Sequence, residues 1–125
     1  MVRDFRDYDV LGHLDLIRRY DPYGEFPFER VRDVVAEVLR QVVSDGKGIE
    51  LNTSGIRYGL GDFQPSREIL ELYRDLGGTV VTVGSDSHTP DHLGSYLRLA
   101  YRELAELGFE GVWTFRCHEG SRHLF

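Results

Sequence analysis

The chain has 125 residues, of which 41% are hydrophobic and 29% charged, so we expect a single domain, 1–125, with its own hydrophobic core. Its net charge of -6 argues against a nucleic-acid partner, because such partners usually require a basic face. The single cysteine excludes an intrachain disulfide framework, and with no apolar run of membrane-spanning length and a charged amino terminus we expect a cytoplasmic protein without a membrane partner.

The hydrophobic pattern predicts strands that alternate with helices. Four short apolar runs, bounded by turn residues, are typical of strands: 8–11, 48–52, 79–83 and 111–115. Three longer segments carry apolar residues at helical spacing: 28–43, 66–76 and 90–107. Turn residues predict a loop at 20–24, and the tail 116–125 shows no clear period.

This alternation implies parallel strands joined by right-handed crossovers. We therefore expect an α/β fold of about four parallel strands with three intervening helices, either an open layer or a partial β/α barrel. In such a fold the loops that follow the strands lie at one edge of the sheet, which is where ligands and catalytic groups collect. We expect a functional site at this edge.

Two of these loops carry pairs of possible metal ligands. Asp86 and His88 lie two residues apart just after the strand at 79–83, and residues at this spacing project to the same side of an extended backbone. His13 and Asp15 repeat the pattern in reverse order after Gly12. Such pairs offer a metal ion nitrogen and oxygen donors, and the alternative for each pair is a solvated or packed loop.

The loop 53–59 is rich in hydroxyl groups and glycine and contains one arginine. Its backbone N–H groups, with Thr53, Ser54 and Arg57, are suited to hold an anion such as a phosphoryl group. The alternative is an ordinary surface loop. Secondary candidates are one histidine, a second phosphate-binding arginine and two aromatic pocket walls: His92, Arg116, Tyr58 and Phe63.

Three stretches, 9–15, 50–57 and 84–88, together resemble the later motifs of histidinol-phosphatases of the PHP (polymerase and histidinol phosphatase) family. The resemblance covers residues 5–111, including the intervening helices. The family fold is a seven-stranded β/α barrel with metal ions at the carboxyl ends of its strands. The resemblance implies that this chain corresponds to the carboxyl-terminal half of such a barrel.

The same resemblance implies a metal-dependent phosphomonoesterase that hydrolyses L-histidinol phosphate, a step of histidine biosynthesis, with a metal-bridging water as nucleophile. The implied ligands to divalent zinc, manganese or iron are His13, Asp86 and His88. The implied substrate-binding residues are Asn52, Thr53, Ser54 and Arg57, of which Arg57 would bind the phosphate. The implied catalytic residues are Asp86, His88 and Arg57.

The chain also departs from the family pattern, since its histidines, at 13, 88, 92, 118 and 123, form no His-x-His pair. Such a pair and further ligands belong to the amino-terminal half of the family. Two alternatives therefore stay open: a phosphoesterase with another substrate, and a non-catalytic module that binds a metal or an anion. A half barrel would leave two strand edges unpaired, which favours a homo-oligomer or pairing with the absent half.

Overall fold

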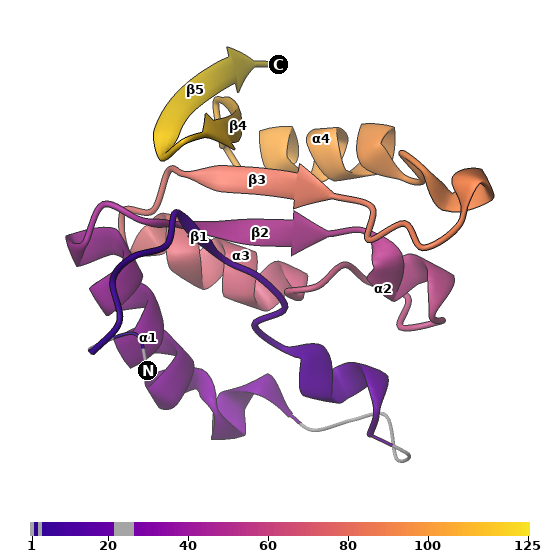
Figure 1. Cartoon of the computed structure of the whole chain (residues 1–125). Coiled ribbons are helices and arrows are strands. Elements are labelled where there is room, and N and C mark those ends of the chain that lie inside the picture. The colour runs from indigo at the N-terminus through magenta and orange to yellow at the C-terminus, as the bar shows by residue number, and fades with distance from the viewer. Residues whose placement is uncertain (1, 3, 22–26) are drawn as a thin grey trace.

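The computed structural model describes residues 2, 4–21 and 27–125, and Figure 1 shows their arrangement. The strands are β1 (Val10–Leu11), β2 (Gly48–Asn52), β3 (Val81–Gly84), β4 (Gly111–Arg116) and β5 (Glu119–Leu124). The α-helices are α1 (Arg32–Ser44), α2 (Ser54–Arg57), α3 (Arg67–Asp75) and α4 (Leu97–Glu106). Three short 3-10 helices are η1 (Leu16–Arg19), η2 (Phe28–Arg30) and η3 (Pro90–His92). The predicted loop at 20–24 extends into 22–26, outside the described residues.

A parallel sheet of three strands, in the order β1-β2-β3, forms the centre of the described chain (Figure 1). Leu11 pairs with Ile49, and Ile49 in turn pairs with Val81, so the three strands run in register. The parallel direction agrees with the sequence prediction. As a consequence the loops that follow β1, β2 and β3 begin at the same edge of the sheet.

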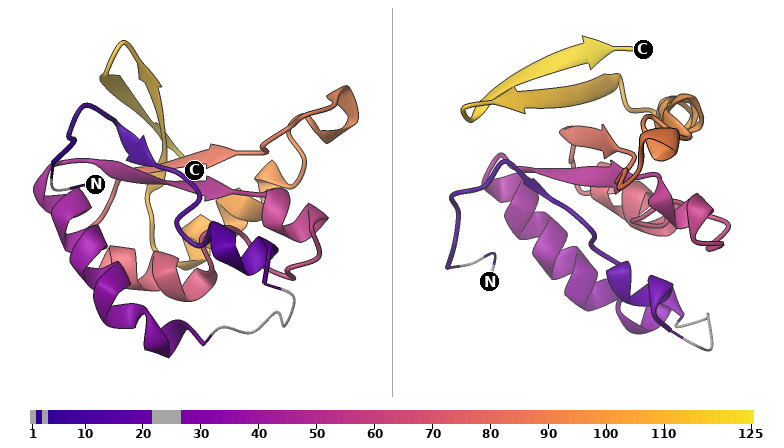
Figure 2. Two further views of the ribbon diagram at one scale, coloured as in Figure 1. Left: turned by 60° about the horizontal axis from the view of Figure 1, so that its bottom comes forward. Right: turned by 45° about the vertical axis from the view of Figure 1, so that its right-hand side comes forward.

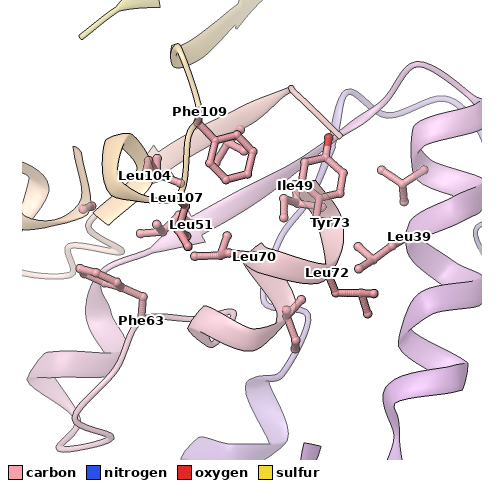
Figure 3. Packing of buried hydrophobic residues seen from close by; sticks show 14 of the residues in the cluster. Leu39, Ile49, Leu51, Phe63, Leu70, Leu72, Tyr73, Leu104, Leu107 and Phe109 are labelled. Carbon is pink, nitrogen blue, oxygen red and sulfur yellow. The ribbon is translucent and has the colours of Figure 1, made fainter. Parts of the chain in front are cut away.

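The core lies between one face of this sheet and the helices. Ile49, Leu51 and Val81 alternate along the strands and are fully buried on this face. Figure 3 shows Leu39 of α1 and Leu70 of α3 on the side of the sheet that carries Ile49 and Leu51. Burying each such side chain contributes roughly 1.5–3 kcal/mol, so the helix-facing side of the sheet supplies much of the driving force for folding.

The fourth predicted strand forms but does not extend the parallel sheet. β4 pairs antiparallel with β5, from Gly111 with Leu124 to Arg116 with Glu119, so the described parallel sheet has three strands and not four. Figure 2 shows this hairpin on the side of the sheet away from α1. Its turn residues, Cys117 and His118, both have positive φ, as type I′ turns require. Asn and Gly normally signal such turns, and β5 is exposed along its length, so neither feature was visible in the sequence pattern.

The helix predicted at 90–107 is interrupted. η3 ends at His92, Tyr96 has a left-handed backbone with φ of 62°, and α4 begins only at Leu97. Leu93, an apolar residue of this predicted helix, is 80% exposed. The segment 28–43 is likewise divided into η2 and α1, and α2 lies within the predicted loop 53–59. No helix in the described ranges combines the length and apolar character needed to span a bilayer.

Candidate active site

Three loops define the carboxyl edge of the parallel sheet. His13 follows β1, Thr53 follows β2 and Asp86 follows β3. The N–H of Thr53 donates a 2.8 Å hydrogen bond to the carbonyl oxygen of Gly84, which ties the second loop to the end of the third strand. The carboxyl edge of a parallel sheet is where open α/β folds bind ligands, so the candidate site is placed here.

Two of the predicted metal ligands share an unusual backbone conformation. His13 has φ of 52° and Asp86 has φ of 49°, which places both residues in the left-handed region. Residues other than glycine adopt this region at some energetic cost, of order 1 kcal/mol. Strained residues are concentrated at functional sites, so the conformation is consistent with a functional role at the ends of β1 and β3.

The guanidinium of Arg57 is anchored to the loop after β3. Its Nη1 donates to the carbonyl oxygen of Ser85 at 3.2 Å and its Nη2 donates to that of Asp86 at 2.9 Å. A guanidinium carries five N–H donors, so these two bonds leave donors for an anion. The predicted phosphate-binding residue is therefore held beside Asp86.

A second arginine, Arg19 at the end of η1, also lies beside Asp86. Its Nη1 is 3.7 Å from Oδ2 of Asp86, and its guanidinium carbon lies 3.1 Å from the centre of the Tyr58 ring. The side chain of Arg19 is only 13% exposed, so this stack on Tyr58 fixes its position. Arg19 is not recognisable from the sequence, because its contacts are with Tyr58 and Asp86, far along the chain, and no spacing in the sequence indicates them.

The polar residues at the end of β2 and directly after it serve mainly to hold the loop. The Oδ1 of Asn52 accepts a 2.9 Å hydrogen bond from the N–H of Ser54, and the hydroxyl of Thr53 donates to the carbonyl oxygen of Ser95 at 2.6 Å. Of the four predicted substrate-binding residues, Asn52, Thr53 and Ser54 are buried. The hydroxyl of Ser54 has no hydrogen-bond partner in the described part of the chain. The loop therefore offers Arg57 to a ligand more directly than these three residues.

Asp15, the carboxylate of the predicted His13–Asp15 pair, has a structural role. Its Oδ2 accepts hydrogen bonds from the N–H of Ser66 at 2.9 Å and from the Arg18 guanidinium at 3.0 Å. The residue is buried, and this burial raises the pKa of its carboxyl group above the usual range. Asp15 thus connects the segment after β1 to the beginning of α3.

The metal-ligating donors are only partly gathered. His88 is exposed, and its Nδ1 lies 2.9 Å from the carbonyl oxygen and 3.8 Å from the Oδ1 of Asp86. The Nδ1 of His13 is buried without a hydrogen-bond partner among the described residues. Imidazole and carboxylate donors suit zinc and similar metals. However, no group of three or more His, Cys, Asp or Glu side chains is positioned to hold a metal ion in residues 2, 4–21 and 27–125. The chain brings Asp86 and His88 together and does not complete the set with His13.

Of the secondary candidates, Tyr58 lies at this edge, whereas Arg116 and Phe63 do not. Arg116 ends β4 next to the turn residue His118, whose Nδ1 lies 3.1 Å from Oδ1 of Asp9, just before β1. This position is at the opposite end of the strands, so the prediction that Arg116 lies on the active edge is wrong. Phe63 is buried in the core, whereas Tyr58 is half exposed at the candidate site.

The fold and the site define a mixed α/β protein with a parallel sheet and an arginine-rich carboxyl edge. A probable histidinol-phosphatase of Thermotoga maritima is 38% identical over 103 residues, which are 82% of this chain and 42% of that protein. The histidinol-phosphatase of Lactococcus lactis is 31% identical over 117 residues, covering 92% of this chain and 43% of that protein. No family model matches the sequence.

The solved structure of the Lactococcus lactis histidinol phosphate phosphatase, in complex with zinc, L-histidinol and phosphate, is also similar. It superposes on 97% of this chain and 46% of that protein with a TM-score of 0.75 and 28% identity. The resemblance to histidinol-phosphatases predicted from three motifs is therefore confirmed. The chain spans less than half the length of these relatives, which fits the prediction that it corresponds to one half of such a protein, the carboxyl-terminal one.

Proposed function

We propose that the chain forms part of a metal-dependent phosphomonoesterase that hydrolyses L-histidinol phosphate to L-histidinol and phosphate. The observation that supports this most is the superposition of nearly the whole chain on an enzyme that binds zinc, L-histidinol and phosphate. The anchoring of both Arg57 and Arg19 beside Asp86 is independent support, because two fixed guanidinium groups suit a phosphoryl group.

In this proposal Arg57 and Arg19 bind the phosphoryl oxygens of the substrate and orient them at the carboxyl edge of the sheet. His13, Asp86 and His88 contribute ligands to divalent metal ions, with zinc as the first candidate. A bound metal supplies a water of lowered pKa and neutralises charge on phosphoryl oxygens. The left-handed backbone of His13 and Asp86 directs both residues away from the regular path of their strands.

The incomplete ligand set leads to a further part of the proposal. The described residues gather no group of three ligands, and we infer that a partner segment contributes further ligands to the metal site. In this proposal residues 1–125 form a single domain, and its three parallel strands are part of a β/α barrel. The edge of β1 opposite β2 then pairs with a strand of the segment that completes the barrel. Pairing, oligomeric state and the expected cytoplasmic location stay predictions.

Fragment complementation tests the proposal directly. The chain is mixed with the segment of the Thermotoga maritima relative that lies outside its match, and phosphate release from L-histidinol phosphate is measured with zinc, manganese or iron. We expect release from the mixture and a loss of at least about tenfold with Arg57→Ala. The matched control is Arg98→Ala, which removes an exposed arginine of α4.

The alternatives give different results in the same assay. A mixture that hydrolyses other phosphomonoesters and leaves L-histidinol phosphate intact would indicate another substrate. A mixture without any phosphatase activity, in which the chain still binds zinc and inorganic phosphate, would indicate a non-catalytic binding module. A chain that binds neither zinc nor phosphate would contradict the proposed function altogether.

A further inference from the structure

A single charged residue, Glu50, lies within the three strands of the parallel sheet, in the middle of the central strand β2. Ile49 and Leu51 on either side of it are fully buried against the helices, so Glu50 projects from the opposite face of the sheet. Figure 1 shows β2 between its two neighbours, with α1 and α3 on the helix-covered face. The central strand thus carries one half-buried carboxylate between two fully buried aliphatic residues.

Two glycines leave the space that the Glu50 carboxylate occupies. A Cβ atom on Gly12 would lie 3.0 Å from its Oε2, and a Cβ atom on Gly84 would lie 2.8 Å from its Oε1. Gly84 pairs with Asn52, two residues beyond Glu50, so the side chain leans toward the carboxyl edge of the sheet. Gly12 immediately precedes His13. The carboxylate therefore lies between the loops that carry the candidate metal ligands.

The charge of this carboxylate is not matched by a cation in the described part of the chain. The amide of Asn52 donates to Oε2 at 3.5 Å, which is a long hydrogen bond, and Glu50 forms no ion pair with a described residue. The two arginines of the site are directed to Asp86 and its backbone instead. A half-buried carboxylate without a cationic partner favours the binding of a cationic group.

We propose that Glu50 is a specificity-determining residue that binds the ammonium group of an aminoalkyl phosphate. This inference rests on the proposed function, and it assigns a binding residue to the end of the substrate that does not carry the phosphate. Arg57 and Arg19 take the anionic phosphoryl end, and Glu50 takes the cationic end at the same edge of the sheet. An ammonium donates three N–H bonds and so satisfies both oxygens of the carboxylate.

The test measures binding to the full chain by titration calorimetry in a buffer that contains zinc. Three probes are used: L-histidinol, its deamino analogue 3-(imidazol-4-yl)propan-1-ol, and inorganic phosphate. We expect wild type to bind L-histidinol more tightly than the analogue. In Glu50→Gln the ratio of these two affinities should fall by about tenfold, and the affinity for phosphate should change by less than about twofold. Glu119→Gln, which makes the same change at the exposed end of β5, is expected to behave as wild type.

Gly84→Ala provides a second variant that keeps the charge of Glu50. Its new Cβ displaces the carboxylate, so it should also weaken L-histidinol and leave the analogue unchanged. Equal L-histidinol affinity in wild type and Glu50→Gln would overturn the inference and leave the proposed function standing. Phosphate binding without any L-histidinol binding would overturn it in the same way. If wild type binds neither L-histidinol nor phosphate, both the inference and the proposed function fail.

Discussion

The guanidinium of Arg57 donates a 2.9 Å hydrogen bond to the backbone carbonyl oxygen of Asp86 and thereby joins the end of α2 to the loop after β3. The bond places a fixed positive charge beside the Asp86 carboxylate without using that carboxylate as its acceptor. Arg57 therefore leaves the carboxylate oxygens of Asp86 available to a metal ion or to Arg19, whose Nη1 lies 3.7 Å from Oδ2. Anion binding and metal binding can in this way share one loop.

The first prediction concerns the shape of the Arg57 side chain. Arg57→Lys keeps the charge but loses the planar fork that reaches two carbonyl oxygens at once. We expect the free energy of unfolding to fall by about 1 kcal/mol and phosphate affinity to fall by about tenfold. Urea denaturation and phosphate titration measure these changes, with Arg98→Lys as the control. Unchanged phosphate binding in Arg57→Lys would remove Arg57 from the site.

The second prediction concerns metal binding by His13. Its Nδ1 is buried without a hydrogen-bond partner in the described residues, so removal of the ring breaks no hydrogen bond that this nitrogen makes there. We expect His13→Ala to lower zinc affinity by at least about tenfold with only a small change in stability. His123→Ala, on the hairpin, removes an exposed imidazole and should leave zinc affinity unchanged. Equal losses in the two variants would indicate surface binding of zinc.

The sequence predicted the elements that depend on hydrophobic burial and missed those that depend on distant polar contacts. The short apolar run around Ile49 and Leu51 predicts β2 correctly, because both side chains are buried against the helices. By contrast, the position of Arg19 depends on Tyr58 and Asp86, which fold next to it from other loops. No local periodicity encodes such a contact.

The environment of Glu50 was likewise not predictable from the sequence. In the sequence it is one charged residue inside an apolar strand, and only the three-dimensional position of Gly12 and Gly84 explains how its carboxylate fits. The β4–β5 hairpin was missed for a related reason, since its turn uses Cys117 and His118 where Asn and Gly are the recognisable signal. Motifs located the edge of the sheet, and packing determined which side chains reach it.

The third prediction concerns alkaline pH and Tyr73. Its hydroxyl donates to the carbonyl oxygen of Val80 at 3.1 Å, and burial raises its pKa from 10.0 to about 12. The unfolded chain therefore ionises first as pH rises above 10, so this contribution to stability is lost between pH 10 and about 12. Tyr73→Phe should lower the free energy of unfolding by about 1 kcal/mol at neutral pH and reduce the loss at high pH.

Urea denaturation at neutral pH and near pH 11 measures both effects of Tyr73→Phe. The control, Tyr101→Phe, removes the hydroxyl of a partly exposed tyrosine on α4. An alkaline loss of stability that is as large in Tyr73→Phe as in wild type would assign that loss to other groups.

The fourth prediction concerns acidic pH and Asp15. Because burial raises the pKa of Asp15 above 3.8, the folded state holds its proton more tightly than the unfolded state. Stability should therefore fall as pH rises from 3.8 through the raised value. Asp15→Asn removes the titrating group and retains an acceptor for the N–H of Ser66, so its stability relative to wild type should increase with pH in this window.

Denaturation curves between about pH 4 and pH 7 give this comparison. Asp75→Asn, which changes an exposed carboxylate on α3, is the control. A stability difference between Asp15→Asn and wild type that does not vary with pH would show that the Asp15 carboxyl has the same pKa in the folded and unfolded chains.

Anomalous diffraction at the zinc edge, from crystals of the chain grown with zinc and phosphate, tests the central claim most directly. We predict a zinc peak about 2.0–2.2 Å from a carboxylate oxygen of Asp86 and from an imidazole nitrogen of His13 or His88, with phosphate against the Arg57 guanidinium. Zinc found only at the hairpin histidines, with phosphate absent from Arg57, would contradict the account.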